Sequence, residues 1–380
     1  MQLQRSKRLE PFKLADYSYL RLKSRPRLPT TRNKVRIVDL YCGAGSLSLG
    51  IWEACRELGV GFESAAAIDI NPSALDVYVA NFPQARTILA DSRTLIDGKI
   101  GERVTKNERA LMDAIGKFGW LNSGSPCQGF SPLNNRSRGR DERNSLYLRG
   151  TRLVEVAMPE NILFENVPDV LNGDIDVVGI TRDTLGKLAY HMDSRIVDLS
   201  ILGVPQVRRR HLLVASMSKK VSIERMIDER RVTHPRSVWW AIWDLEGKET
   251  RDIYGSPSKL SLENQHRVDY LQRTGAFDLP NRLRPPCHRG VHRYKSMYGR
   301  LNYGGPSQTI TSGFSSPGQG RFIHPTKRRT LTPHEAARLQ FFPDFFDFSA
   351  VRSRAALAEM IGNAVPSKLS SVIGLNLLAN

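Results

Sequence analysis

The chain has 380 residues, of which 40% are hydrophobic and 25% are charged, proportions that exclude a disordered or fibrous protein. No apolar run reaches transmembrane length and the N-terminus is too charged for a signal peptide, so we expect a cytoplasmic protein without a membrane partner. The formal net charge of +18 indicates a polyanionic partner, and nucleic acid rather than a membrane surface, because no basic amphipathic segment stands out.

Much of this charge lies near the N-terminus. The segment from Arg5 to Arg36 holds eleven Lys and Arg residues against Glu10 and Asp16. A run of this kind is either a solvated tail or a direct contact with phosphates, and the sequence leaves both alternatives open.

The four cysteines form no CxxC pair, which indicates reduced thiols in a cytosol. Cys287-His288 together with His292 has the spacing of metal ligands. No fourth ligand is evident nearby, so we predict no metal site.

The first predicted strand, Val35 to Leu40, is followed by a glycine turn that contains Gly43 and Gly45 and then by a helical pattern from Leu47 to Leu58. A strand, a glycine turn and a helix open a nucleotide-binding α/β unit. Ser48 stands where the dinucleotide fingerprint has its third glycine, which counts against NAD.

Two further predicted strands also end in carboxylates. Ser64 to Ile70 contains Asp69 at its end, and Arg86 to Ala90 is followed by Asp91. Each aspartate is either a helix N-cap or a ligand group, Asp69 for a ribose and Asp91 for an adenine edge. Three successive strand ends with Gly, Asp and Asp favour a ligand crevice.

Cys127 follows the predicted strand Gly119 to Ser123, in a loop with prolines on both sides. Pro126 fixes its own φ and restricts the residue before it, so the thiol is aimed. A structural buried cysteine is the alternative. The polar run from Asn134 to Asn144 has no apolar period and is expected to be a mobile loop beside this nucleophile.

After a helix over Asn144 to Met158, the strand Asn161 to Phe164 leads into Glu165. This carboxylate ends a strand at the same sheet edge as Cys127, the edge at which open α/β sheets bind ligands. His191 to Leu199 and Arg210 to Ser216 then predict a terminal hairpin. Strand alternation would place Gln206, Arg208 and Arg210 on one face.

From Met217 to Arg321 the regular βα pattern stops, and basic residues alternate with aromatic ones between glycines and prolines. This composition suits contact with nucleic acid, and an ordinary small β-rich domain is the alternative. The last predicted helix begins at Pro366.

Pro126-Cys127-Gln128 resembles the catalytic motif of the cytosine-C5 DNA methyltransferases, and further motifs similar to those of this family follow in its order between Arg36 and Ala379. They are Glu165-Asn166-Val167, Gln206-Val207-Arg208-Arg209-Arg210, a ninth motif within Leu331 to Phe346, and Asn363-Ala364-Val365. The resemblance implies an α/β fold, a Rossmann-like S-adenosylmethionine-dependent methyltransferase sheet with a smaller, irregular β-rich target-recognition domain. The predicted segments are a basic extension (1–34), a catalytic and cofactor-binding domain (35–216), the target-recognition domain (217–321) and a return segment (322–380).

The resemblance also implies roles for single residues. Cys127 would attack carbon 6 of a flipped-out cytosine in double-stranded DNA, Glu165 would contact the base, and Arg208 and Arg210 would favour the thiolate. S-adenosylmethionine would be bound by Asp39, Tyr41, Gly43, Gly45, Asp69, Ile70, Asp91, Ser92, Asn363 and Val365. The compact length is typical of a monomeric prokaryotic modification enzyme, whose partner would be a restriction endonuclease acting on the same site.

Three alternatives remain. A tRNA cytosine-C5 methyltransferase would share these motifs, but the Cys-Phe-Thr signature associated with that branch is absent. A catalytically silent DNA-binding homologue is disfavoured by the intact set of Cys127, Glu165, Arg208 and Arg210. An NAD oxidoreductase is disfavoured by the missing glycine.

Overall fold

A computed structural model of the chain describes residues 11–126, 145–289 and 296–379. Within this part the chain divides into two compact units. The sheet unit comprises Pro26–Leu199, Arg209–Arg231 and Pro366–Asn380, and the irregular unit comprises Met1–Arg25, Ser200–Arg208 and Val232–Val365. The boundaries of these units differ from those of the four segments predicted from the sequence. The four segments remain a prediction about functional domains.

The sheet unit is built on seven strands in the order β3-β2-β1-β4-β5-β7-β6. The strands are β1 (Lys34–Leu40), β2 (Gly61–Asp69), β3 (Thr87–Leu89), β4 (Trp120–Ser123), β5 (Asn161–Asn166), β6 (His191–Asp198) and β7 (Arg209–Ser216). The first five are parallel, and β7 runs antiparallel to both β5 and β6. All seven predicted strands and the terminal hairpin are therefore confirmed.

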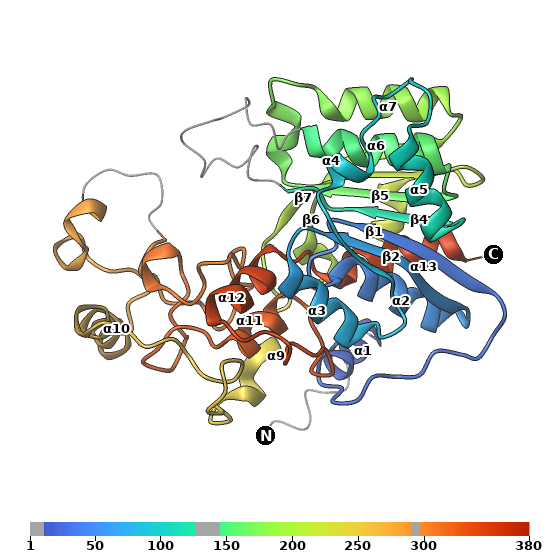
Figure 1. Cartoon of the computed structure of the whole chain (residues 1–380). Coiled ribbons are helices and arrows are strands. Elements are labelled where there is room, and N and C mark those ends of the chain that lie inside the picture. The colour runs from blue at the N-terminus through green and yellow to red at the C-terminus, as the bar shows by residue number, and fades with distance from the viewer. Residues whose placement is uncertain (1–10, 127–144, 290–295, 380) are drawn as a thin grey trace. The chain divides into compact units, whose positions relative to one another are not determined.

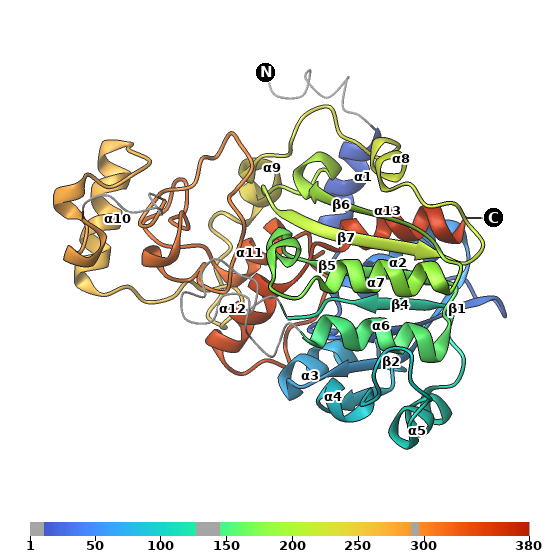
Figure 2. The same cartoon turned by 90° about the horizontal axis from the view of Figure 1, so that it is seen from above.

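Helices cover both faces of this sheet (Figure 1). One layer contains α4 (Ser92–Leu95), α5 (Lys106–Ile115), α6 (Ser145–Ala157) and α7 (Val177–Lys187); the other contains α2 (Ser46–Leu58), α3 (Pro72–Asn81) and α13 (Ser367–Leu378). Figure 2 shows α6 and α7 running along the strands. Parallel strands that are covered on both faces are buried, and their sequences are therefore nearly continuous apolar runs.

The late helix α13 packs directly on α2. A Cβ added at Gly50 would lie 2.1 Å from the carbonyl oxygen of Ser367, and one added at Gly374 would lie 2.9 Å from Cβ of Ala54. The Ser370 hydroxyl donates to the carbonyl oxygen of Leu47 over 2.8 Å. The two helices approach so closely that only glycine fits at these positions.

The irregular unit contains α1 (Pro11–Leu20), α9 (Val238–Ile242), α10 (Leu262–Thr274), α11 (Pro333–Leu339) and α12 (Arg354–Asn363), with short 3₁₀ turns between them. The sequence predicted a β-rich domain over 217–321, and this is wrong for the residues described there. They hold helices, including α8 (Ile223–Asp228) of the sheet unit, and only isolated bridges such as Arg300 to Ile323. Arginines replace a strand ladder, since Arg300 and Arg321 donate to backbone carbonyls at residues 275–277.

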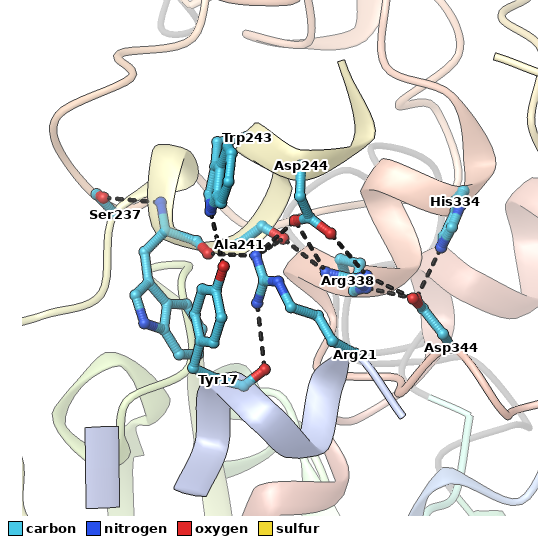
Figure 3. A network of polar contacts seen from close by, with 10 residues as sticks. Tyr17, Arg21, Ser237, Ala241, Trp243, Asp244, His334, Arg338 and Asp344 are labelled. Carbon is cyan, nitrogen blue, oxygen red and sulfur yellow. Dashed lines mark hydrogen bonds and ion pairs between the residues drawn. The ribbon is translucent and has the colours of Figure 1, made fainter. Parts of the chain in front are cut away.

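Part of the basic N-terminal segment, α1 and Arg21, is folded into the irregular unit and is not a solvated tail. Asp16 and Leu20 of α1 are buried in the irregular unit. Arg21 donates to Asp244 over 2.6 Å and to the carbonyl oxygen of Trp240 over 2.9 Å (Figure 3). The network continues from Asp244 through Arg338 of α11 to Asp344 and His334. Helix α1 is therefore fixed to α9 and α11 by a network of partly buried charges.

Glu335, also on α11, is the centre of a second buried cluster. It lies 2.8 Å from Arg329 and 3.3 Å from Nε2 of His324. Burial alone would raise the pKa of Glu335, but the hydrogen bonds and charges of His324 and Arg329 outweigh it and lower this pKa to about 2.

Candidate cofactor site and catalytic edge

The turn between β1 and α2 is held in an unusual backbone conformation. Tyr41, Gly43 and Gly45 have φ of 62°, 51° and 89°. A Cβ added at Gly45 would lie 2.8 Å from the ring of Tyr78, whereas one at Gly43 would meet no atom within 4 Å. Gly45 is thus required for packing, and the backbone at Gly43 is open to the close approach of a ligand.

Asp69, at the end of β2, supports this turn. One carboxylate oxygen accepts from the backbone N–H of Gly43 over 2.9 Å, and the other accepts from that of Asn71 over 2.9 Å. The side chain of Asn71, not of Asp69, caps α3. The helix-cap alternative is therefore wrong for Asp69, and its predicted contact with a ribose stays a prediction. The neighbouring Ile70 leaves 69% of its surface exposed.

Asp91 does cap a helix. Its carboxylate accepts from the backbone N–H of Arg93 at the start of α4, and the Arg93 guanidinium lies 2.6 Å away. These hydrogen bonds lower the pKa of Asp91. Its predicted role at an adenine edge remains a prediction.

Ser92 and Tyr41 join the turn to α6. The Tyr41 hydroxyl lies 2.8 Å from both Ser92 Oγ and the carbonyl oxygen of Leu146. A carbonyl only accepts, so Tyr41 donates to Leu146 and accepts from Ser92. Tyr41 and Ser92 are thus brought together, as two of the predicted cofactor residues.

Asp39 is buried beneath the turn. Ser48 Oγ donates to its carboxylate over 2.5 Å, and Ser48 in turn lies 2.7 Å from the hydroxyl of Tyr78. Burial raises the pKa of Asp39 to about 7, against the opposing effect of the Ser48 hydrogen bond. Sequence reasoning noted Ser48 only as a missing glycine, and missed that a hydroxyl there could hold the carboxylate.

Glu165 lies at the carboxyl end of β5, as predicted, and is buried. Nε of Arg210, on the adjacent antiparallel β7, lies 2.7 Å from its Oε1. A Cβ added at Gly124 would lie 3.8 Å from its other carboxylate oxygen. The segment that leads into Cys127 therefore begins beside Glu165.

Asn166 fixes that segment to β5. Its side-chain N–H₂ donates to the carbonyl oxygen of Ser125 over 3.2 Å and to Ser125 Oγ over 3.0 Å. The side-chain oxygen Oδ1 of Asn166 accepts from the backbone N–H of Val167. Cys127 itself, like the predicted mobile loop, lies outside the described residues, so its position relative to Glu165 stays a prediction.

Arg208 differs from the expectation that it shares a strand face with Arg210. Strand β7 begins at Arg209, and the two arginines belong to different units. Arg208 is buried and donates to the carbonyl oxygens of Ile310 and Gly362, over 2.9 and 3.3 Å. These contacts support the irregular unit just before Asn363, so a catalytic role for Arg208 stays a prediction.

Asn363, at the end of α12, and the buried Val365 also belong to the irregular unit, and their cofactor role stays a prediction. Among the described residues, no three His, Cys, Asp or Glu side chains converge on a point that could hold a metal ion. Sγ of Cys287 lies 3.1 Å from Nδ1 of His288, whereas His292 lies outside the described part. No helix in that part is long and apolar enough to cross a membrane.

Comparisons with known proteins agree over nearly the whole chain. Residues 35–379 match the model of the C-5 cytosine-specific DNA methylase family. The type II methyltransferase M1.BsuMI of Bacillus subtilis is 43% identical over 96% of this chain and 85% of its own length. The type II methylase M.HgiDII of Herpetosiphon aurantiacus is 28% identical over 89% of this chain and 93% of its own.

Solved structures show the same fold. A DNA modification methyltransferase encoded within an E. coli prophage has a TM-score of 0.65 at 22% identity, covering 91% of this chain and 100% of its own. The Dnmt2 methyltransferase of S. pombe has a TM-score of 0.61 at 20% identity, covering 90% and 98%. At such low identity these two structures support the Rossmann-like architecture alone.

Proposed function

Because the chain belongs to the C-5 cytosine-specific DNA methylase family, we propose that it methylates carbon 5 of a cytosine flipped out of a specific double-stranded DNA sequence, through a covalent adduct with Cys127. The enzyme is a DNA cytosine-5-methyltransferase of the type II restriction-modification class, and its methyl donor is S-adenosylmethionine. The observation that carries the proposal is the buried Glu165, which pairs with Arg210 and lies beside the segment leading into Cys127.

The residues at the carboxyl edge of β1, β2 and β3 fit the cofactor. The exposed side chain of Ile70 offers an apolar surface to an adenine, and Asp69 has lone pairs left for ribose hydroxyls. The open backbone at Gly43 leaves room for the rest of the molecule, and Tyr41, Ser92 and Asp91 form the neighbouring wall. Asn363 and Val365 would lie behind the cofactor. When bound, it supplies an electrophilic methyl group on a sulfonium.

The protein side chains prepare the cytosine. Carbon 5 is a poor nucleophile, so the Cys127 thiolate first adds to carbon 6 and pushes electron density onto carbon 5. Glu165 would contact N3 and the 4-amino group, and its proton at N3 would stabilise the negative charge that develops on the ring as sulfur adds. Arg210 holds the carboxyl group of Glu165 in place. After methyl transfer, loss of the carbon-5 proton and of Cys127 restores the ring. The target must leave the stacked duplex for this chemistry.

A fluorine at carbon 5 tests this proposal, since fluorine cannot leave as a cation and Cys127 then stays attached. The recognition sequence would first be found by bisulfite sequencing of DNA from cells that express the chain. A duplex with 5-fluorocytosine at that target should become covalently attached only when S-adenosylmethionine is present. Cys127→Ser should abolish attachment because a neutral hydroxyl is far less nucleophilic than a thiolate.

Cys287→Ser is the matched control, because its thiol is exposed but lies in the irregular unit. An adduct mapped to any cysteine other than Cys127 would refute the mechanism. An RNA duplex that is trapped in place of DNA would favour the tRNA alternative, and a chain without methylation or trapping would be a silent homologue. We also propose that the enzyme acts as a monomer in a prokaryotic cytoplasm, together with a restriction endonuclease of the same specificity.

A further inference from the structure

A cavity of about 430 Å³ lies within the irregular unit, and none of the predicted catalytic or cofactor residues lines it. It is lined by Leu14, Tyr17, His234, Pro235, Arg236, Ser237, Trp239, Trp240, Trp243 and Gly304. Trp239 and Trp243 are 48% and 42% exposed, and half of the surface of Leu14 is exposed as well. Large apolar side chains that gather at one exposed place usually mark a binding site.

The aromatic walls of this cavity are held in fixed positions (Figure 3). Nε1 of Trp243 donates to the hydroxyl of Tyr17 over 3.0 Å, and the Arg21 guanidinium covers the Tyr17 ring at 3.5 Å. The backbone N–H of Trp239 donates to the carbonyl oxygen of Tyr303. The rings of Trp239 and Trp243 are 5.7 Å apart and inclined by 17°. The indole faces are thus preorganised, which lowers the entropic cost of binding a flat group.

The size and charge of the cavity restrict its ligand. Its volume falls in the range of small-molecule pockets, so one nucleotide could enter and a duplex could not. No carboxylate is among the described lining residues; Arg236 is buried, at 3% exposed, and His234 is the exposed basic residue of the lining. Nothing in the lining repels a phosphate, and exposed indoles stack on any base.

The cavity lies apart from the residues of the proposed chemistry. Two of its lining residues, Leu14 and Tyr17 on α1, precede residue 35, at which the family match begins, and the others lie within the match. Glu165 and Asp69, which serve the target cytosine and the cofactor in the proposed function, belong to the other unit. A ligand of this cavity would therefore be neither the target cytosine nor S-adenosylmethionine.

We propose that the cavity binds one unpaired nucleotide of the DNA, distinct from the target cytosine, with the base stacked on the exposed indoles of Trp239 and Trp243 and its phosphate towards the exposed His234. The inference rests on DNA being the substrate. It gives the enzyme a second point of contact with DNA, one that prefers a nucleotide that has left the duplex.

Fluorescence anisotropy can test this with two labelled duplexes of one sequence, lacking the methylation site. One carries a single unpaired adenine, and the other carries an abasic residue at the same position. The wild-type protein should bind the first about tenfold to a hundredfold more tightly, the range expected for stacking of one base. Trp239→Ala and Trp243→Ala should remove the difference, and Trp239→Phe should retain most of it because an aromatic face remains.

Phe277→Ala is the matched control, since Phe277 is an exposed aromatic residue outside the cavity lining. It should keep the full preference. Unchanged calorimetric affinity for S-adenosylmethionine would show that the tryptophan variants are folded.

Equal binding of the two duplexes by the wild type, or a preference that survives in both alanine variants, would overturn the inference. So would a change of oligomeric state in the tryptophan variants, because the cavity would then be a protein interface. Methylation of duplex DNA, measured separately by bisulfite sequencing, reports on the proposed function and not on this cavity.

Discussion

Burial of the Asp39 carboxyl group raises its pKa, and we expect this to make cofactor binding depend on pH. With its pKa raised to about 7, the folded protein keeps a proton that the unfolded chain releases near pH 4. By linkage, the contribution of Asp39 to stability is therefore largest at low pH and is lost as the pH rises through about 7. The ionised form is the one that attracts a cationic cofactor.

We expect the affinity for S-adenosylmethionine to increase as the pH is raised through about 7 and binding to release a proton, because the cofactor carries a positive sulfonium. Asp39→Asn should flatten this dependence, since the amide does not titrate. Isothermal titration calorimetry in buffers of different ionisation enthalpy measures both effects. The prediction fails if wild type and variant release the same number of protons.

At the same scale, sequence reasoning treated Asp69 and Asp91 alike, as carboxylates at strand ends that either cap a helix or bind a ligand. Asp91 caps α4, whereas the cap of α3 is Asn71. The difference depends on where each helix begins, and a shift of two residues decides it. Helix boundaries are the least certain feature of a sequence prediction, so this distinction required coordinates.

Among the elements, the link between β5 and the segment before Cys127 depends on one amide. Asn166→Asp would replace the side-chain N–H₂ that donates to Ser125 by an oxygen. This oxygen would face the carbonyl oxygen of Ser125 with no proton between them, and it would no longer donate to the Ser125 hydroxyl. We expect the rate of covalent trapping on 5-fluorocytosine to fall about 100-fold, the loss typical of a misplacement of about 1 Å. Calorimetric affinity for S-adenosylmethionine should stay within about twofold.

Ser125→Ala is the control for this variant, since it removes the hydroxyl and leaves the bond from Asn166 to the carbonyl oxygen. A smaller loss is expected there. Equal losses of trapping and of cofactor affinity in Asn166→Asp would show general damage to the sheet unit instead.

Helix α11 provides a prediction about stability. Glu335 is buried between Arg329 and His324, and its pKa is lowered to about 2. Its stabilising effect is complete above its unfolded pKa of about 4.3 and is lost as the pH falls towards 2. Glu335→Gln should cost about 3 kcal/mol at pH 7, as for a broken buried ion pair.

Thermal unfolding followed from pH 7 to acid conditions checks this. The gap in melting temperature between wild type and Glu335→Gln should narrow as the pH falls below about 4, where the unfolded chain takes up a proton, and close near pH 2, where the native carboxylate is protonated too. A gap that stays constant with pH would assign the loss to packing.

For the whole molecule, all seven strands could be predicted from the sequence. Buried parallel strands such as β5 contain apolar runs, and β6 and β7 are expected as a hairpin. The division into two units could not be predicted. It depends on contacts between distant residues, such as Arg21 with Asp244 and Arg208 with Gly362, 223 and 154 positions apart. Nor could the sequence show that arginine–carbonyl bonds, rather than strands, organise the segment around Arg300.

The net charge of +18 predicts binding to DNA that weakens steeply with salt, with log K falling by about 0.9 per phosphate neutralised. Lys23, Arg27 and Arg32 are exposed, and they lie in the segment that follows α1 in the sequence. Replacing all three by Gln should reduce the salt slope, by up to about 2.7, while bisulfite sequencing finds the same methylated site. A different methylated sequence would mean that this segment contacts bases, and that residues 217–321 do not recognise the DNA sequence alone.

The packing of α13 on α2 also sets the order in which the protein can be made. Ser370 bonds to a carbonyl 323 residues earlier, so α2 leaves the ribosome roughly 16 to 65 seconds before its partner exists. During that interval the face of α2 around Gly50 has no cover, and a nascent or truncated chain exposes it to chaperones and proteases. We therefore expect methylation to begin only once α13 has been made and has packed on α2.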